Sequence, residues 1–444
     1  MHVELTQGPV FRRLIRFALP LMFGNLLQQL YNIADTLIVG RFAGPDALAA
    51  VGSAYTLMTF LTSILLGMSM GSGAVFSIRY GQGDREGLKS GIFHSFFLIG
   101  AVTLAMNILV FLFIDPILGL LQVPGNVYPI MREYLWIIFL GIPAVFLYNY
   151  FASLLRAVGN SLAPLLFLGI SAVLNIVLDL LLVVVFHQGA GGAAAATAVS
   201  QYVSGAGILL YTLIRFPRLR LQKRHLRFRS SVMKEIANLS FLTCIQQSVM
   251  NFGILMVQGL VNSFGSIVMA AFAAAVKIDS FAYLPVQDFG NAFSTFAAQN
   301  YGAKKSGRVS AGFRCAFLTS VIFGASISAV VFLFAGPLMR LFVDPSQAEI
   351  VAVGVRYLRI EGSFYFAIGI LFLLYGFYRA VKKPMMSIVL TVISLGLRVA
   401  LAYVLSSIPA LGVTGIWMSV PIGWAAADLA GLLYYRRCRR AEET

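Results

Sequence analysis

Two residues one helical turn apart could do chemistry inside an otherwise apolar segment. The segment is SAVLNIVLDLLLVVVF (171–186), and the two residues are Asn175 and Asp179. Their spacing places an amide and a carboxyl on one face of a helix. A charged side chain at the centre of a bilayer costs about 2.5–3.5 kcal/mol on insertion scales, so such residues usually face a polar interior and carry a function.

Two further polar residues, Asp35 and Thr197, reach the same depth on other apolar segments. Each lies about seven residues, or about 10 Å of helix, from the outer end of its segment, as Asp179 does. Asn175 lies one turn deeper. Oxygen ligands suit a hard cation, and two carboxylates attract either a cation or a proton. We therefore predict one binding site for H⁺ or Na⁺, formed by Asp35, Asn175, Asp179 and Thr197.

The alternative is that these side chains only join helices through hydrogen bonds. Such bonds contribute about 0.6 kcal/mol on average in membranes, which is small compared with the cost of inserting a carboxylate. No Lys or Arg in these segments offers either carboxylate a permanent partner. The pattern therefore favours a binding function for the two acids, while Thr197 alone is equally compatible with bonding to its own helix backbone.

Apolar helices must position these residues, because the composition is that of a membrane protein. Of 444 residues, 59% are hydrophobic and 11% are charged, and apolar stretches of the roughly 20 residues that span a bilayer recur throughout. We predict an all-α polytopic membrane protein with twelve transmembrane helices. The predicted spans are 14–41, 47–78, 88–121, 127–156, 163–186, 190–214, 235–263, 268–300, 308–342, 347–380, 385–407 and 411–435.

The net charge of +16 is an orientation signal and does not indicate nucleic acid. Of the 33 Lys and Arg residues, 26 fall at the two termini or in the loops after spans 2, 4, 6, 8 and 10, and seven are exceptions. By the positive-inside rule, both termini are cytoplasmic and the protein lies in the cell (inner) membrane. The exceptions are Arg41, Arg132, Arg340, Arg356 and Arg359 on the other side, with Lys277 and Arg398 inside spans.

The chain contains an internal duplication. RYGQGDREG (79–87) matches NYGAKKSGR (300–308) at an offset of 221, and LLRAVGNSLAP (154–164) matches FYRAVKKPMMS (377–387) at an offset of 223. We therefore predict an N-lobe at 1–214, a basic cytoplasmic linker at 215–234 and a C-lobe at 235–444. Six spans per copy give both lobes one orientation, as in secondary transporters with two pseudo-symmetric bundles around a central cleft.

Polar residues on the first span of each lobe are candidates for the lining of that cleft. A polar seam between packed helices is the alternative. The predicted lining residues are the polar Gln28, Asn32, Gln247 and Asn251, together with the apolar Met256. The C-lobe lacks the acidic site, because Arg398 and Ala402 stand where the N-lobe has Asn175 and Asp179. Its own ionisable residues have mixed signs that permit internal pairing, and they are Lys277, Asp279, Asp288, Glu361 and Arg398.

Enzyme chemistry has no support in the sequence. It contains no phosphate-binding glycine loop, no His/Cys metal cluster and no nucleophile motif. We therefore expect a monomer that is not an enzyme, with no cofactor or metal other than the coupling ion, and with the lipid bilayer and small organic molecules as its partners.

The sequence resembles the multidrug and toxic compound extrusion (MATE) family along all twelve spans. The motifs are ALPLMFGNLLQQLYNIADTLIVGRFAGPDALAAVG, the YGQGD and QNYGA turns, LRAVGNS and LNIVLD. The resemblance implies two six-helix lobes around a V-shaped cleft, and an antiporter that exports organic, often cationic, compounds by alternating access against inward H⁺ or Na⁺.

The resemblance also assigns residues. The family's N-lobe cation site falls on Asp35, Asn175, Asp179 and Thr197, with Tyr31 and Asn149 as neighbours and a bend at Pro20. Some relatives use C-lobe acids, but Gln246 and Gln247 replace the acid on the first span of that lobe, which favours coupling in the N-lobe. The alternative function is a lipid-linked oligosaccharide flippase of the same superfamily, whose cleft would need Arg residues for a pyrophosphate.

Overall fold

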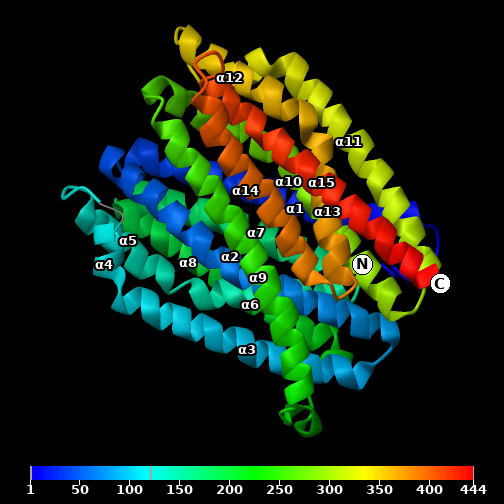
Figure 1. The fold of residues 1–444 in the computed structure, drawn as a ribbon. Coiled ribbons are helices and arrows are strands. Elements are labelled where there is room, and N and C mark those ends of the chain that lie inside the picture. Colours follow the sequence, from blue (N-terminus) through cyan, green and yellow to red (C-terminus); the bar gives the residue numbers. More distant parts are fainter. Residues whose placement is uncertain (1–2, 121–122, 444) are drawn as a thin grey trace. The chain divides into compact units, whose positions relative to one another are not determined.

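The computed structural model describes residues 3–120 and 123–443, and helices account for nearly all of them (Figure 1). No strand occurs in these two ranges, so the predicted all-α class is confirmed. The elements are α1 Val10–Phe42, α2 Pro45–Gln82, α3 Arg85–Leu112, α4 Ile114–Leu120, α5 Tyr128–Phe139, α6 Ile142–Ala157, α7 Leu162–Asp179, the π-helix η1 Leu180–Val185, α8 Gly189–Arg215, η2 Pro217–Leu219, η3 Lys223–Leu226, α9 Ser230–Asn262, α10 Ser266–Gly302, α11 Ser306–Arg340, α12 Ala348–Glu361, η4 Gly362–Phe364, α13 Tyr365–Ala380, α14 Pro384–Ser406 and α15 Val413–Glu443.

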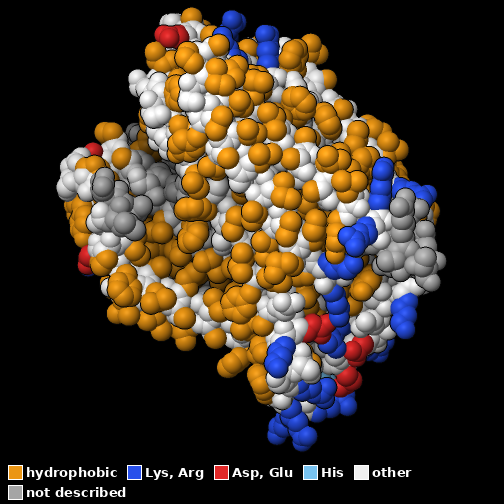
Figure 2. Space-filling view, in the orientation of Figure 1, with side chains coloured by type: hydrophobic (Ala, Val, Ile, Leu, Met, Phe, Trp, Pro, Cys, Tyr) orange, Lys and Arg blue, Asp and Glu red, His pale blue; other side chains and the backbone are white. Residues whose placement is uncertain are grey.

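Most of these helices are built to cross a membrane. Among the described residues, ten are long and apolar enough to span a bilayer, with α12, η4 and α13 counted as one, and the bent pair α5 and α6 would make an eleventh. Helix α1, which has 33 residues and carries Asn25, Gln28, Gln29, Asn32 and Asp35, is not among them. It corresponds to the first of the twelve predicted spans. Figure 2 shows hydrophobic side chains over most of the visible face, with Lys and Arg in a few groups.

The break between α5 and α6 shows how a span can bend inside lipid. The two helices meet at 43° across Leu140 and Gly141. The carbonyls freed at the break accept hydrogen bonds from the side chains of Asn107 (2.7 Å, to Phe139) and Tyr202 (2.7 Å, to Leu140). Backbone groups in a membrane must be satisfied within the protein, so these two side chains make the bend tolerable.

The predicted duplication is visible in the helix bounds. Both ends of α6 differ from those of α13 by 223 residues, and α1 and α9 have 33 residues each. Gly44 before α2 and Gly265 before α10 adopt the same rare conformation, with φ of 91° and 93°. A positive φ favours glycine, so both copies use the same turn for the same reason.

The chain forms two compact units. The first unit comprises Phe23–Cys244 with the start of the chain up to Glu4, and the second unit comprises Leu5–Met22 and Ile245–Thr444. Helices α1 and α9 are each divided between the units, and the division of α1 follows Pro20 by two residues. Proline removes a helix hydrogen bond and kinks the helix, so the division falls where α1 is weakest.

Within the first unit, α9 begins by packing closely on α2. A Cβ atom at Gly71 would lie 2.5 Å from the carbonyl oxygen of Leu239, and one at Gly67 would lie 2.6 Å from the Cα of Cys244. The hydroxyls of Ser72 and Ser240 also share a 2.9 Å hydrogen bond. Small residues permit such close approach of helices in membranes.

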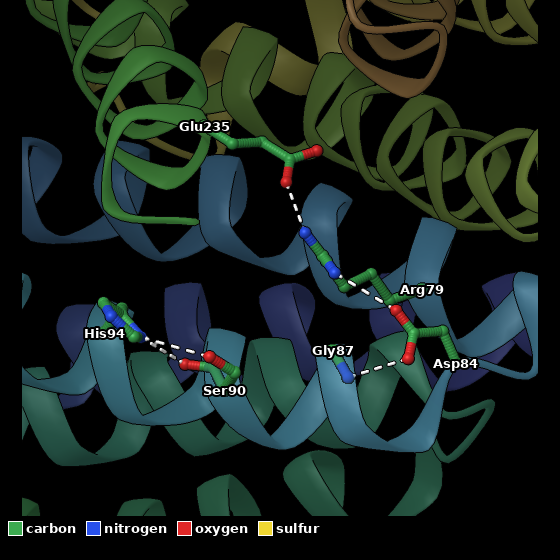
Figure 3. Close-up of polar contacts among 6 residues, drawn as sticks. All are labelled: Arg79, Asp84, Gly87, Ser90, His94 and Glu235. Atoms are coloured by element: carbon green, nitrogen blue, oxygen red, sulfur yellow. Dashed lines mark hydrogen bonds and ion pairs between the residues drawn. The ribbon is translucent and has the colours of Figure 1, made fainter. Parts of the chain in front are cut away.

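An ion pair fixes the same two helices near the basic linker. The Arg79 side chain at the end of α2 lies between Glu235 of α9 (2.6 Å) and Asp84 (3.1 Å), as Figure 3 shows. Asp84 in turn caps α3 by accepting a hydrogen bond from the Gly87 N–H (2.8 Å). Arg79 therefore joins the start of α9 to the turn between α2 and α3.

Candidate functional site

Asp35 and Asp179 come together inside the first unit. Asp35 lies in α1 and is half-buried, whereas Asp179 is the last residue of α7 and is fully buried. Their carboxyl groups lie close enough to act on each other electrostatically. Two carboxylates that close repel each other unless a proton or a cation lies between them.

Asn175 and Thr197 continue this group toward α8. The Asn175 amide nitrogen donates a hydrogen bond of 3.2 Å to the Thr197 hydroxyl, and Asn175 is 2% exposed. One turn earlier, the Ser171 hydroxyl donates to the Ser200 carbonyl (2.9 Å), so α7 and α8 are joined by successive polar contacts. Asp35, Asn175, Asp179 and Thr197 are called the N-lobe acid cluster below.

Four buried oxygen atoms of this cluster have no protein donor. They are Oδ1 of Asp35, Oδ1 of Asn175 and both carboxyl oxygens of Asp179, each without a hydrogen-bond partner among the described residues. Buried polar atoms are normally satisfied, and exceptions require an explanation such as a bound ion or a catalytic role. Four convergent oxygens without donors are suited to a proton or a small hard cation.

Two tyrosines surround the acids, and one of them was not singled out from the sequence. Tyr31 of α1 lies close to Asp35 and to the Gln28 side chain. Tyr134 of α5 is buried and lies close to both Asp35 and Asp179. In the sequence Tyr134 stands in the apolar run YLWIIF and has no polar neighbour on its helix face. Its counterpart at the offset of 223 is Tyr357, and this match between the two repeats is a sequence signal that could have identified Tyr134.

The helix that carries Asp179 changes its geometry immediately after this residue. Leu180–Val185 form a π-helix, and the Phe186 N–H bonds to the Leu181 carbonyl at 2.9 Å. Such π-helical turns are rare in proteins overall, and those that occur are often found at functional sites. The matching helix of the second unit, α14, remains α-helical over Pro384–Ser406, so among the described residues this irregular geometry occurs only in the unit that contains Asp35 and Asp179.

Other predicted residues are less closely tied to the cluster. The Asn149 amide donates to the Val145 carbonyl of its own helix (2.9 Å), and no bond from it to the acids occurs among the described residues. Among the predicted lining residues, Gln247 is buried, Asn32 and Asn251 are half-buried, and Met256 is 41% exposed. The cleft that they would line stays a prediction.

The remaining ionisable residues of the second unit separate into two sets. Asp279, Glu361 and Arg398 are all buried and lie within electrostatic range of one another. Lys277 is exposed, although it is only two residues from Asp279 on α10. Asp288 is buried further along α10.

A duplicated bundle of membrane-crossing helices, with two acids close together whose buried oxygens lack donors, is typical of one class, the polytopic membrane transporters. Comparison with known proteins gives the family. The family model MatE matches residues 20–181 and 240–404. A probable multidrug resistance protein of Bacillus subtilis, YpnP, is 31% identical over 438 residues, covering 98% of this chain and 96% of the relative. The chain therefore belongs to the MatE family, and it is a transporter and not an enzyme.

Two further similarities agree with this assignment. The probable multidrug resistance protein NorM of Thermotoga maritima is 27% identical, with coverage of 92% of this chain and 88% of that protein. A solved outward-facing structure of a multidrug resistance MATE family transporter of the MOP superfamily matches with a TM-score of 0.93 over 100% of this chain and 99% of that chain. At 23% identity, this second similarity shows the fold alone.

Proposed function

We propose that the protein exports organic, cationic or amphipathic compounds in exchange for inward H⁺ or Na⁺. Family membership supports transport, and the names of the relatives YpnP and NorM support multidrug export. Alternating access between two lobes would carry substrate outward and the coupling ion inward in one cycle.

The observation that carries the coupling part of this proposal is the set of four buried oxygens without donors in the N-lobe acid cluster. An ion that binds there would neutralise Asp35 and Asp179 and would satisfy the free oxygen of Asn175. Binding energy of this kind can shift a two-state equilibrium only if the two states bind the ion differently. We propose that the pairing of α1 with α7 is the feature that differs between the states, because α1 is the helix divided between the two units.

The alternative function, a lipid-linked oligosaccharide flippase, has less support in the first unit. A pyrophosphate requires several cationic donors around it. The N-lobe acid cluster instead offers carboxyl, amide and hydroxyl groups, with tyrosines next to them. This chemistry repels a phosphate and attracts a cation.

The remaining parts of the proposal concern membrane topology, oligomeric state and cofactors. We propose that both termini face the cytoplasm, as the distribution of Lys and Arg indicates. The protein acts as a monomer in the cell membrane, with no cofactor beyond the coupling ion.

Efflux of a cationic fluorescent dye tests the function in cells. A host without its own efflux pumps is loaded with the dye and energised, and dye loss is followed with and without an uncoupler. We expect expression of the protein to accelerate dye loss in a manner that disappears with the ion gradient. Equal dye loss with and without the protein, for a panel of cationic and amphipathic dyes, would refute export of this substrate class.

A further inference from the structure

The second unit contains a buried ionic cluster with a different composition. Asp279 of α10, Glu361 at the end of α12 and Arg398 of α14 are 6%, 3% and 9% exposed. Tyr357 lies close to both carboxyl groups, and Tyr365 lies close to Asp279. Arg398 acts on the two carboxyl groups through space, because none of the ion pairs among the described residues includes it. Asp279 Oδ1, Glu361 Oε2 and Arg398 Nε are buried without a hydrogen-bond partner among the described residues. These five residues are called the C-lobe ionic cluster.

Aromatic side chains close this cluster off from water. Trp417 of α15 stacks on Phe272 at a centroid distance of 5.4 Å and meets Tyr357 edge to face at 4.9 Å. Tyr357, Tyr365 and Trp417 are each no more than 2% exposed. The charges of Asp279, Glu361 and Arg398 therefore lie in an environment where an uncompensated charge is costly.

The repeat relates the two clusters residue by residue. At the offset of 223, which both ends of α6 and α13 obey, Tyr134 corresponds to Tyr357 and Asn175 corresponds to Arg398. A guanidinium thus stands in the second unit where the first unit has an amide with a free oxygen. Around the acids of the first unit the described neighbours are Asn, Thr, Tyr and Gln, with no cationic side chain among those identified.

We propose that Arg398 is a built-in counter-ion for Asp279 and Glu361, which occupies the second unit in place of a mobile ion. This inference rests on the proposed function, and it means that only the first unit exchanges the coupling ion. A buried carboxylate pair needs a positive charge. The first unit obtains that charge from outside, whereas the second unit carries it on α14. The two lobes then differ in the source of the positive charge, and the residue at one position of the repeat, Asn175 or Arg398, determines this source.

A gain of ion binding tests the proposal. Arg398→Asn gives the second unit the residue that the first unit has. It is made in an Asp35→Asn/Asp179→Asn background, so that the N-lobe acid cluster has no carboxylate. The melting temperature of the purified protein is measured against NaCl, with choline chloride as the ionic-strength control, and against pH between 5.5 and 8.5.

We expect the background protein to melt at a temperature that does not depend on Na⁺. With Arg398→Asn added, the melting temperature should rise by about 2–5 °C with Na⁺ or with decreasing pH, because a ligand that binds only the folded state stabilises it. Adding Glu361→Gln should remove this rise. If Arg398→Asn adds no dependence on either ion, the counter-ion role is wrong.

A second arm covers the outcome in which Arg398→Asn does not fold. Arg398→Lys keeps the charge, and Arg398→Gln/Glu361→Gln removes one charge of each sign. We expect both to fold and melt closer to the wild type than Arg398→Gln alone does. If Arg398→Lys lowers the melting temperature as much as Arg398→Gln does, and if adding Glu361→Gln to Arg398→Gln does not restore it, Arg398 acts through its shape and the proposal fails.

These readouts are independent of transport. If the Asp35→Asn/Asp179→Asn background still exports dye, the proposed coupling site is wrong, yet the effect of Arg398→Asn on that background still decides the role of Arg398.

Discussion

Asp35 of α1 and Asp179 at the end of α7 bring their carboxyl groups into reach of each other within the first unit, although they are far apart in the sequence. The contact joins the helix that is divided between the two units to the helix that turns into a π-helix. A change of charge at this contact can therefore alter how α1 and α7 pack.

Neutralising either acid should abolish coupling. Asp35→Asn and Asp179→Asn each remove a charge that the ion would compensate, so we expect dye efflux to fall by on the order of 10–100-fold with little change in protein abundance. The double variant should be no worse than either single one, because the acids act as a unit. Efflux from energised cells and immunoblots measure both quantities.

The control for these variants is Asp46→Asn. Asp46 is an exposed acid in the first turn of α2 and accepts a hydrogen bond from Asn126. Its replacement should leave efflux unchanged. Wild-type efflux in both Asp35→Asn and Asp179→Asn would show that the acid pair does not couple transport.

The amide of Asn175 should contribute to ion affinity. Asn175→Ala removes a free oxygen and a donor to Thr197, and we expect the ion concentration for half-maximal transport to rise about tenfold. Asn149→Ala is the matched control, because its amide bonds only to the backbone of its own helix among the contacts described. Equal effects of the two substitutions on ion dependence would contradict a specific role of Asn175.

Packing of α2 against α9 should tolerate no side chain at Gly71. A Cβ atom there would lie 2.5 Å from a backbone oxygen, so we expect Gly71→Ala to destabilise the protein by about 1–3 kcal/mol. Gly52→Ala in the same helix is the control, since no atom lies within 4 Å of the added Cβ. It should be neutral or stabilising, by about 0.5–1 kcal/mol. Thermal melting in detergent separates the two, and similar melting temperatures would argue against the close approach.

The Arg79 and Glu235 ion pair should stabilise the attachment of α9. The side chains are 18% and 22% exposed and their atoms are 2.6 Å apart, so Glu235→Gln should cost about 1 kcal/mol. The pair between Arg132 and Asp115 is 43% and 52% exposed, and Asp115→Asn should change the melting temperature little. A larger loss for Asp115→Asn than for Glu235→Gln would reverse this ranking.

Much of the architecture was predictable from sequence, because spans and repeats leave periodic signals. The twelve-span helical fold is confirmed, and the matching bounds of α6 and α13 agree with the predicted duplication. Helix α1 was predicted as the first span, although it is not among the helices that meet the length and hydropathy requirement for a span.

The parts that sequence did not indicate depend on tertiary contacts. In the sequence Tyr134 is part of an apolar run, and only the structure shows that it lies close to both acids. The bend between α5 and α6, with its bonds from Asn107 and Tyr202, also has no signal in the sequence. The π-helix after Asp179 has no composition signal, since LLLVVV fits an ordinary span equally well. The mixed signs of the second unit permitted pairing, but only the structure separates exposed Lys277 from buried Arg398.

Transport in proteoliposomes tests the central claim most directly. Purified wild-type protein and the Asp35→Asn/Asp179→Asn variant are reconstituted, and an inward gradient of H⁺ or of Na⁺ is imposed separately while movement of a cationic dye is recorded. The account predicts that one of the two gradients drives dye transport by the wild-type protein and that neither drives it in the variant. Gradient-driven transport at the wild-type rate in the variant would contradict it.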